Sequence, residues 1–244
     1  MKHFRYMIIG VFVVVGVCTA AVTNAGLQDY LKDTVKTLTQ KKGVTSNEIT
    51  QGLKEALEVG TGRAIENVSR VDGYYKNPEI KIPLPAGVKK VEKVLRVAGY
   101  GEQIDVFEAS MNRAAERAAP KAQTIFSDAI EGMNFADARK ILDGRDSEAT
   151  LYFKGKTYDK LTAAFKPIVN KSMSEVGVTR QYQTLDAKIK TIPFAGKRSF
   201  DLDQYVTDQS LKGLFSMLAK EEATIRKNPA ARGTDLLKKV FGSR

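Results

Sequence analysis

TYDKLTAAFKPIVNKSMSEV, residues 157–176, carries the clearest structural signal in the chain. Apolar side chains recur here every three or four positions, which is the spacing of one face of an α-helix. This stripe comprises Tyr158, Leu161, Phe165, Ile168 and Val176. Pro167 lies inside the pattern, and because proline removes a helix hydrogen bond we expect a kink there. The stretch predicts a long helix with one face in a core.

The same periodicity extends outward on both sides of this stretch. Runs that alternate with period two, which would indicate strands, are scarce. Thr45 with Glu48 predicts a capping box at the start of one helix, and Asn134 with Asp137 predicts another cap. We expect at least one helical turn at 147–153, and helices over about 27–41, 45–71, 87–98, 103–118, 120–131, 134–143, 157–176, 202–228 and 234–241.

Two stretches differ from this pattern. Residues 77–85, NPEIKIPLP, contain three prolines, which exclude the α conformation from themselves and from the residue before each. We expect an extended strap there, or a lone edge strand, and a less regular segment over 177–199. Gly60 and Ala64 on one helical stripe predict a close approach by another helix. The predicted fold class is all-α, a single compact multi-helix domain over 26–244 with little or no sheet.

The first 25 residues have the pattern of an export signal. Lys2 and Arg5 precede an apolar run over 7–17, which is shorter than the roughly 20 residues that span a bilayer. Small residues follow, and we expect cleavage after Ala25, with Ala21 as the second possible site. An uncleaved anchor is the alternative. The sequence therefore predicts a periplasmic or secreted protein.

Cleavage there would remove the only cysteine and the only histidine, Cys18 and His3. A lipid anchor at Cys18 is not expected, because such a site needs a small residue before the cysteine and Val17 stands there. The cysteine-free mature chain could run neither a Ser-His-Asp nor a Cys-His mechanism, and it lacks the usual zinc ligands. No cofactor or metal is expected.

The chain is basic, with a net charge of +11, and loss of Lys2 and Arg5 with the signal would leave +9. In the cytoplasm this balance would suggest nucleic acid, but export argues against that partner. The partners expected outside are anionic lipid, peptidoglycan or an envelope protein. The alternative is that the charge only keeps the protein soluble. The oligomeric state is open.

Two polar clusters are the candidate site, and neither is assigned as catalytic. The first is the pair Glu221 and Glu222 with Arg226 one turn further on. A buried glutamate with a raised pKa could act as general acid on a glycosidic bond of peptidoglycan. The simpler interpretation is a surface pair between Glu222 and Arg226.

The second cluster consists of Glu108, Asn112, Arg113 and Glu116. Three of its members share a helical face beside small alanines, where a neighbouring helix could come close. If that face is internal its charges need partners, and we expect Arg226 or Arg232 in that role. Such a buried network is more often structural than a ligand site. An apolar stripe over 236–241 is expected to dock the tail on the domain.

Several phrases together resemble a known family: GLKEAL at 52–57, IPLP at 82–85, NRAAE at 112–116, DARKIL at 137–142, ATLYF at 149–153, GLF at 213–215 and DLLKKVFG at 235–242. The family consists of exported bacterial proteins and is defined only as a domain of unknown function. The resemblance covers about 27–242, with Gly233-Thr234 in place of the usual paired threonine. It implies one domain over the mature chain, and export, but no activity or ligand.

We therefore expect a non-enzymatic envelope protein that binds an apolar or anionic envelope component or another protein. One alternative is a carboxylate-dependent peptidoglycan hydrolase. The other is a structural scaffold or oligomer.

Overall fold

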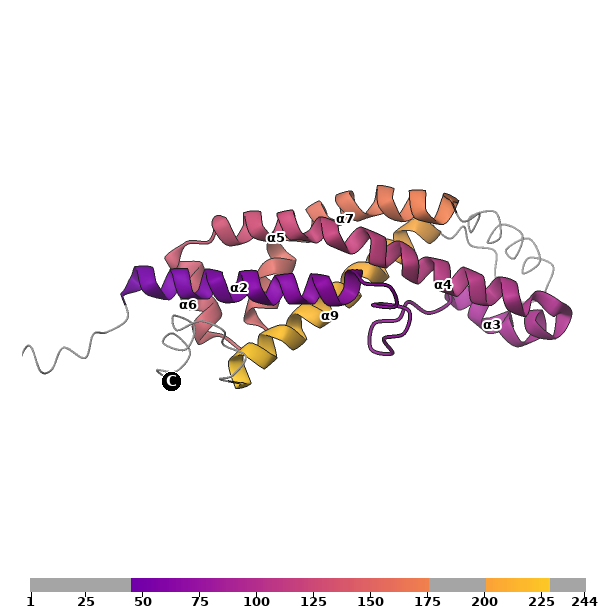
Figure 1. The fold of residues 1–244 in the computed structure, drawn as a ribbon, viewed down its shortest axis with the longest axis horizontal. Coiled ribbons are helices and arrows are strands. Elements are labelled where there is room, and N and C mark those ends of the chain that lie inside the picture. The colour runs from indigo at the N-terminus through magenta and orange to yellow at the C-terminus, as the bar shows by residue number, and fades with distance from the viewer. Residues whose placement is uncertain (1–44, 176–200, 229–244) are drawn as a thin grey trace, which may run out of the picture. The chain divides into compact units, whose positions relative to one another are not determined.

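The computed structural model describes residues 45–175 and 201–228, drawn as coloured ribbon in Figure 1. The expected helices over 27–41 and 234–241 and the segment 177–199 lie outside the described residues. The elements are α2 (Ser46–Ser69), α3 (Ala86–Leu95), the π-helical turn η1 (Arg96–Tyr100), α4 (Gly101–Ala118), the 3-10 turn η2 (Ala119–Lys121), α5 (Ala122–Glu131), α6 (Phe135–Asp143), α7 (Glu148–Glu175) and α9 (Leu202–Lys227). No strand occurs in these two ranges, so the predicted all-α class is confirmed.

Both predicted helix caps are present. The hydroxyl of Thr45 accepts from the N–H of Glu48, whose carboxylate accepts from the N–H of Thr45. Asn134 and Asp137 make the same reciprocal pair at the start of α6. Each pair satisfies backbone donors that the first turn of a helix leaves without partners. These starts are therefore decided locally, by residues three positions apart.

The stretch that was expected as two helical pieces, at 147–153 and 157–176, is one helix of 28 residues. Its buried stripe continues through the gap, because Phe153 and Thr157 are both buried and the hydroxyl of Thr157 donates to the carbonyl of Phe153. Polar residues on the outer face had hidden this continuity. The helix also continues through Pro167, which lies on the exposed side.

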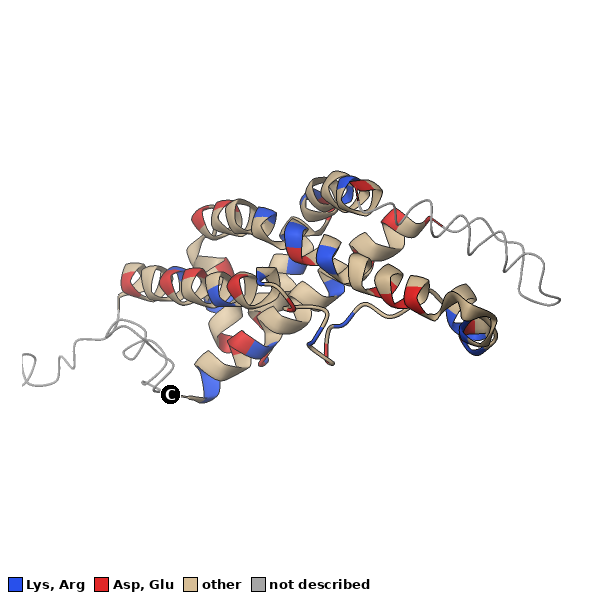
Figure 2. Cartoon of the chain, turned by 45° about the vertical axis from the view of Figure 1, so that its right-hand side comes forward, with Lys and Arg blue, Asp and Glu red and all other residues tan. Residues whose placement is uncertain are grey.

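The core lies between α2, α4, α7 and α9, with α5 and α6 covering one end of α2 and α7. Phe126 of α5 meets Phe153 at 5.1 Å and Phe215 of α9 at 6.1 Å between ring centroids. A Cβ at Gly60 would lie 3.2 Å from the Cδ1 of Ile225, which confirms that α9 approaches α2 closely at this glycine. Charged side chains of both signs are distributed along the helices (Figure 2).

Residues 77–85 form the predicted strap between α2 and α3, a turn followed by extended chain. Ile80, Ile82 and Leu84 alternate into the core and are at most 6% exposed. An extended segment without a neighbouring strand must find other partners for its backbone. The described residues, 45–175 and 201–228, all belong to one compact unit. The expected domain start at residue 26 stays a prediction.

Candidate functional site

The buried amide of Asn112 supplies the partner that the strap needs. Its Oδ1 accepts from the N–H of Ile82 at 2.8 Å, and its Nδ2 donates to the carbonyl of Ile82 at 3.0 Å. A second bond from Nδ2 reaches the carbonyl of Glu108 at 2.8 Å. The side chain is fully buried. Asn112 therefore takes the place of a neighbouring strand for one residue of the strap.

Glu116, one turn further along α4, holds the turn that follows α2. Its Oε1 accepts from the N–H groups of Tyr74 and Tyr75, at 3.0 and 3.2 Å. Its Oε2 accepts from Arg113 at 2.6 Å, and Arg113 also donates to Asp72. Only 4% of Glu116 is exposed, so water does not solvate its negative charge. The guanidinium of Arg113 and the two N–H groups compensate this charge inside the protein.

The partners of Asn112 and Glu116 therefore come from the 72–85 segment, whereas α7 and α9 also pack against α4. Glu108 pairs with Lys81 of the strap at 2.7 Å. A turn and a strap expose backbone groups that a helix would satisfy internally, which explains why polar side chains face them. The second predicted cluster is brought together by the structure, as a support for the strap.

Glu222 of α9 holds the start of α7. Its two carboxylate oxygens accept from the N–H groups of Ala149 and Thr150 at 3.0 and 2.9 Å. The hydroxyl of Thr150 donates to it as well, at 2.9 Å. These N–H groups belong to the first turn of α7, where a helix favours negative charge. A carboxylate from a distant helix thus does the work of a cap.

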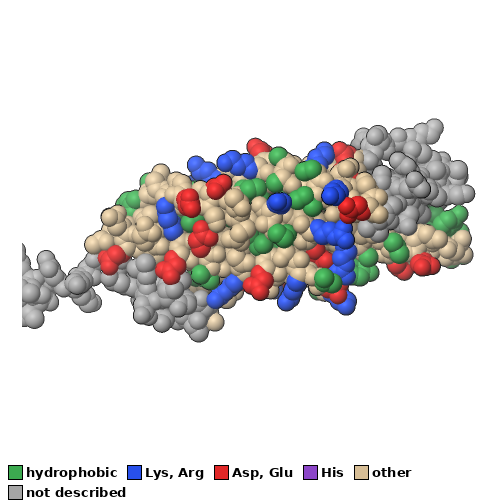
Figure 3. Space-filling view, turned by 45° about the horizontal axis from the view of Figure 1, so that its top comes forward, with side chains coloured by type: hydrophobic (Ala, Val, Ile, Leu, Met, Phe, Trp, Pro, Cys, Tyr) green, Lys and Arg blue, Asp and Glu red, His purple; other side chains and the backbone are tan. Residues whose placement is uncertain are grey.

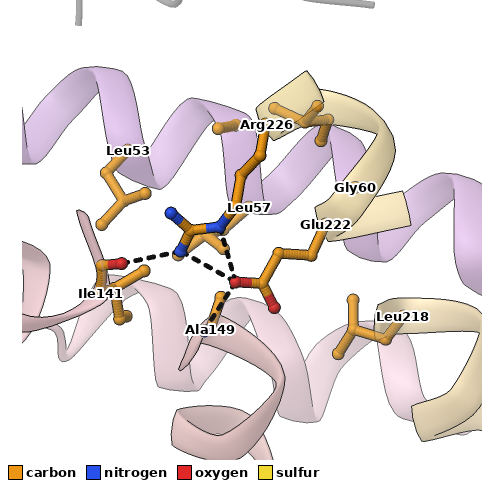
Figure 4. A pocket seen from close by; sticks show the side chains of 10 residues that line it. Leu53, Leu57, Gly60, Ile141, Ala149, Leu218, Glu222 and Arg226 are labelled. Atoms are coloured by element: carbon orange, nitrogen blue, oxygen red, sulfur yellow. Dashed lines mark hydrogen bonds and ion pairs between the residues drawn. The ribbon is translucent and has the colours of Figure 1, made fainter. Parts of the chain in front are cut away.

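Arg226 closes this first predicted cluster (Figure 4). Its guanidinium donates to Glu222 at 2.9 Å and to the carbonyl of Ile141 at 2.7 Å. The two side chains are only 7% and 12% exposed, so the pair is buried where a surface pair was expected. The expected pairing of Arg226 with the Glu116 cluster was wrong, because α9 ends beside α6 and the start of α7.

A small cavity of about 30 Å³ lies beside this pair. Its walls are mainly apolar, with Leu57, Ile141 and Leu218 among them (Figure 4). This volume holds roughly one or two water molecules. A sugar ring is far larger, so the cavity offers no place for a glycosidic substrate beside Glu222.

Glu221, the neighbour of Glu222 in the sequence, is not part of this buried pair. It is half-exposed and makes no ion pair within 45–175 and 201–228. Arg232 lies outside the described residues. The same ranges contain no group of three acidic, histidine or cysteine side chains that could hold a metal, and no helix long and apolar enough to cross a membrane.

A groove between α7 and α9 was missed by the sequence reasoning. It has a volume of about 360 Å³ and is lined by Lys154, Tyr158, Asp208, Gln209, Lys212 and Phe215. The rings of Tyr158 and Phe215 stack at 6.4 Å, and the ammonium of Lys154 lies 6.0 Å from the centroid of Tyr158. The sequence signal available for this groove was the spacing of Lys154 and Tyr158, which lie four residues apart on one helix. Lys212 belongs to a different helix, so the sequence could not show that it lines the same groove.

The electrostatics of the groove centre on one tyrosine and one acid. Burial raises the pKa of Tyr158, and the negative charge of Asp208 raises it further. Tyr158 therefore stays protonated at neutral pH, and its hydroxyl donates to Asp208 at 3.4 Å. Asp208 also accepts from Gln204 at 2.9 Å. Neither Lys154 nor Lys212 has an acidic partner among the described residues, so the groove carries a net positive charge.

No broad single-signed surface competes with this groove on the face shown in Figure 3. Basic and acidic side chains alternate there, with small hydrophobic patches between them. The charged side chains on that face are therefore of both signs and do not form one single-signed patch. Local hollows with unpaired cations are better candidates for a specific site.

The comparisons with known proteins agree with the motifs. The family model described as "Protein of unknown function (DUF4197)" matches residues 43–242, which include every helix that the structure describes. No curated protein and no solved structure matches the chain. The resemblance inferred from the sequence is confirmed. The chain belongs to this family of proteins of unknown function, DUF4197.

Proposed function

We propose that the mature protein is a non-enzymatic binding protein of the cell envelope, and that its ligand is an anionic amphiphile held in the α7–α9 groove. The observation that carries the proposal is the pair of lysines, Lys154 and Lys212, beside an aromatic floor. Export itself rests on the pattern of the first 25 residues.

The floor of the groove suits the apolar part of such a ligand. Phe215 and Tyr158 stack against each other, and both line the hollow. Specific small-molecule sites are typically concave, largely apolar and about 300–1,000 Å³ in volume, with a few polar groups that set orientation. At about 360 Å³ the groove lies at the lower end of that range. It suits a single chain or ring system.

The rim suits the anionic part. Lys154 and Lys212 approach the groove from two different helices, and neither is neutralised by an acid within the described ranges. The charge of Asp208 is engaged by Gln204 and by the hydroxyl of Tyr158. A carboxylate or phosphate between the two ammonium groups would therefore gain charge-assisted hydrogen bonds.

The two buried glutamates support a binding role over a catalytic one. Glu116 and Glu222 each hold two backbone N–H groups and one arginine, which are contacts that serve the fold. A general acid must reach the substrate with a free carboxyl oxygen. The hydrolase alternative therefore gains no support from these residues.

Native mass spectrometry of protein purified from its own envelope tests the proposal. We expect the wild type to retain an anionic amphiphile, and the double variant Lys154→Ala/Lys212→Ala to lose it. Lys121→Ala is the matched control, because Lys121 is exposed, has no acidic partner among the described residues and lies outside the groove. Retention by the double variant at the wild-type level, or no retained amphiphile on the wild type, would contradict the proposal.

A further inference from the structure

The end of the domain formed by α3, η1 and the start of α4 is a helical hairpin, which we call the α3–α4 tip (residues 86–106) (Figure 1). Val88, Val91 and Leu95 form the buried face of α3. Gly99 turns the chain with φ at 89°, a conformation that glycine adopts without strain. The segment from Arg96 to Tyr100 is a kink between α3 and α4, because the chain leaves helical geometry at Gly99.

The outer face of the tip is unusually apolar. Val97 is 92% exposed, Val94 59% and Val106 37%. Three of the six large hydrophobic residues exposed in the described ranges are therefore on this one hairpin. Their exposure costs solvation energy without any packing gain inside the chain. A cluster of this kind marks an interaction surface more often than an isolated valine does.

Lysines lie on the same outer stripe. Lys90, Lys93 and Val94 share one face of α3, and Val97 of η1 follows at the same helical spacing, i, i+3, i+4, i+7. Lys90 and Lys93 are both exposed and have no acidic partner within the described residues. The stripe thus carries two exposed valines at its C-terminal end and, N-terminal to them, two lysines without acidic partners within the described residues.

The other charges of the tip are mostly paired with one another. Arg96 donates to Glu92 at 3.0 Å and to Asp105 at 2.7 Å, and Lys89 contacts Glu92 at 2.9 Å. Hydrogen bonds from Lys89, and next from Arg96, hold the pKa of the Glu92 carboxyl below its usual value, so this carboxyl stays ionised within its pairs.

Glu102 is the remaining acid on the hairpin. It lies in the first turn of α4, where the helix N-terminus favours negative charge. Against this one acid stand the two free lysines, so the unpaired charge of the tip is positive.

We propose that the α3–α4 tip is a docking surface for a bilayer with anionic headgroups. Val94 and Val97 enter the boundary between headgroups and acyl chains, and Lys90 and Lys93 contact the phosphates. An apolar end flanked by lysines is the pattern of elements that bind in the membrane interface. Long lysine side chains place their ammonium groups at headgroup level while their stems follow apolar surface.

The proposal is independent of the α7–α9 groove, because the two surfaces share no residue. Either can fail while the other stands. The groove would hold one ligand molecule, whereas the tip would bring the whole protein to a surface. Two lysines and two valines predict weak, reversible binding that falls with salt.

Co-sedimentation of residues 26–244 with vesicles tests the proposal. We expect binding to vesicles that contain phosphatidylglycerol and little binding to vesicles of phosphatidylcholine alone. Val94→Asp/Val97→Asp should lose binding at least tenfold, since the exposed valines would carry charges into the interface. Lys90→Ala/Lys93→Ala should weaken binding about 25-fold, since each lysine near an anionic surface is worth roughly a factor of five.

Matched controls separate the tip from general effects. Val71→Asp changes a valine that is 77% exposed in the turn after α2, and Lys121→Ala removes an exposed lysine from η2. Both should bind vesicles like the wild type, and so should Lys154→Ala/Lys212→Ala, which alters only the groove. Circular dichroism should show all variants folded.

The proposal is overturned if the wild type does not bind phosphatidylglycerol vesicles, or if the valine variant binds as the wild type does. Equal loss in Val71→Asp would also overturn it, since binding would then not depend on the tip. Loss only in the groove variant would mean that lipid enters the groove, which supports the proposed function and refutes the tip.

Discussion

Glu222→Ala should be among the most destabilising single substitutions in this protein. It removes the acceptor for the N–H groups of Ala149 and Thr150, and it breaks the buried ion pair between Glu222 and Arg226. Removing one partner of a buried pair costs about 3–5 kcal/mol, because the remaining charge stays desolvated. For a chain of this length each kcal/mol lowers the melting temperature by about 2–4 °C. The expected loss is therefore about 6–20 °C.

Glu221→Ala is the matched control, since it removes the same side chain from the adjacent, half-exposed position. It should change the free energy of unfolding by no more than about 0.5 kcal/mol. Thermal unfolding of residues 26–244 followed by circular dichroism measures both variants. A double-mutant cycle with Arg226→Ala should give a coupling energy of about 0.5–3 kcal/mol. If Glu222→Ala melted like Glu221→Ala, the claim that this carboxylate holds the start of α7 would be refuted.

Three further predictions, which use four substitutions, test other parts of the structure. Asn112→Ala leaves the N–H and the carbonyl of Ile82 without partners and should cost about 2–4 kcal/mol in urea unfolding, and a cost near zero would contradict the role given to this amide. Gly155→Ala should stabilise the protein by about 0.5–1 kcal/mol, because a Cβ there meets nothing within 4 Å. Gly213→Ala should destabilise it, because its Cβ would lie 2.6 Å from a buried tyrosine ring, and changes in melting temperature of the same sign for the two variants would refute this pair. Hydrogen bonds from Lys76, and next from Arg113, lower the pKa of Asp72, so its contribution to stability should be complete above its unfolded pKa of about 3.9 and lost as the pH falls through the lower folded value. The difference in stability between wild type and Asp72→Asn should therefore shrink in acid, and a difference independent of pH would argue against the pairing.

The helices could be predicted from the sequence because their determinants are local. The capping box at Thr45 and the cap at Asn134 join residues three positions apart, and periodicity reports which side of one helix is apolar. The strap was predictable for the same reason, since proline acts on its own backbone and on that of its predecessor. The division of α7 into two pieces was the error of this approach. A run of polar residues on the outer face concealed a buried stripe that continues beneath it.

The composition of the candidate site was partly predictable, but its contacts were not. Glu116 and Glu222 were singled out as acids on helical faces, yet periodicity does not say which segment covers a face. The partners of Asn112, Glu116 and Glu222 are 30, 42 and 73 residues away in the chain. The groove that joins Lys154 to Lys212 was invisible for the same reason, because its two sides belong to different helices. Local backbone preference decides where helices form, whereas the packing of their faces against one another decides which polar groups meet.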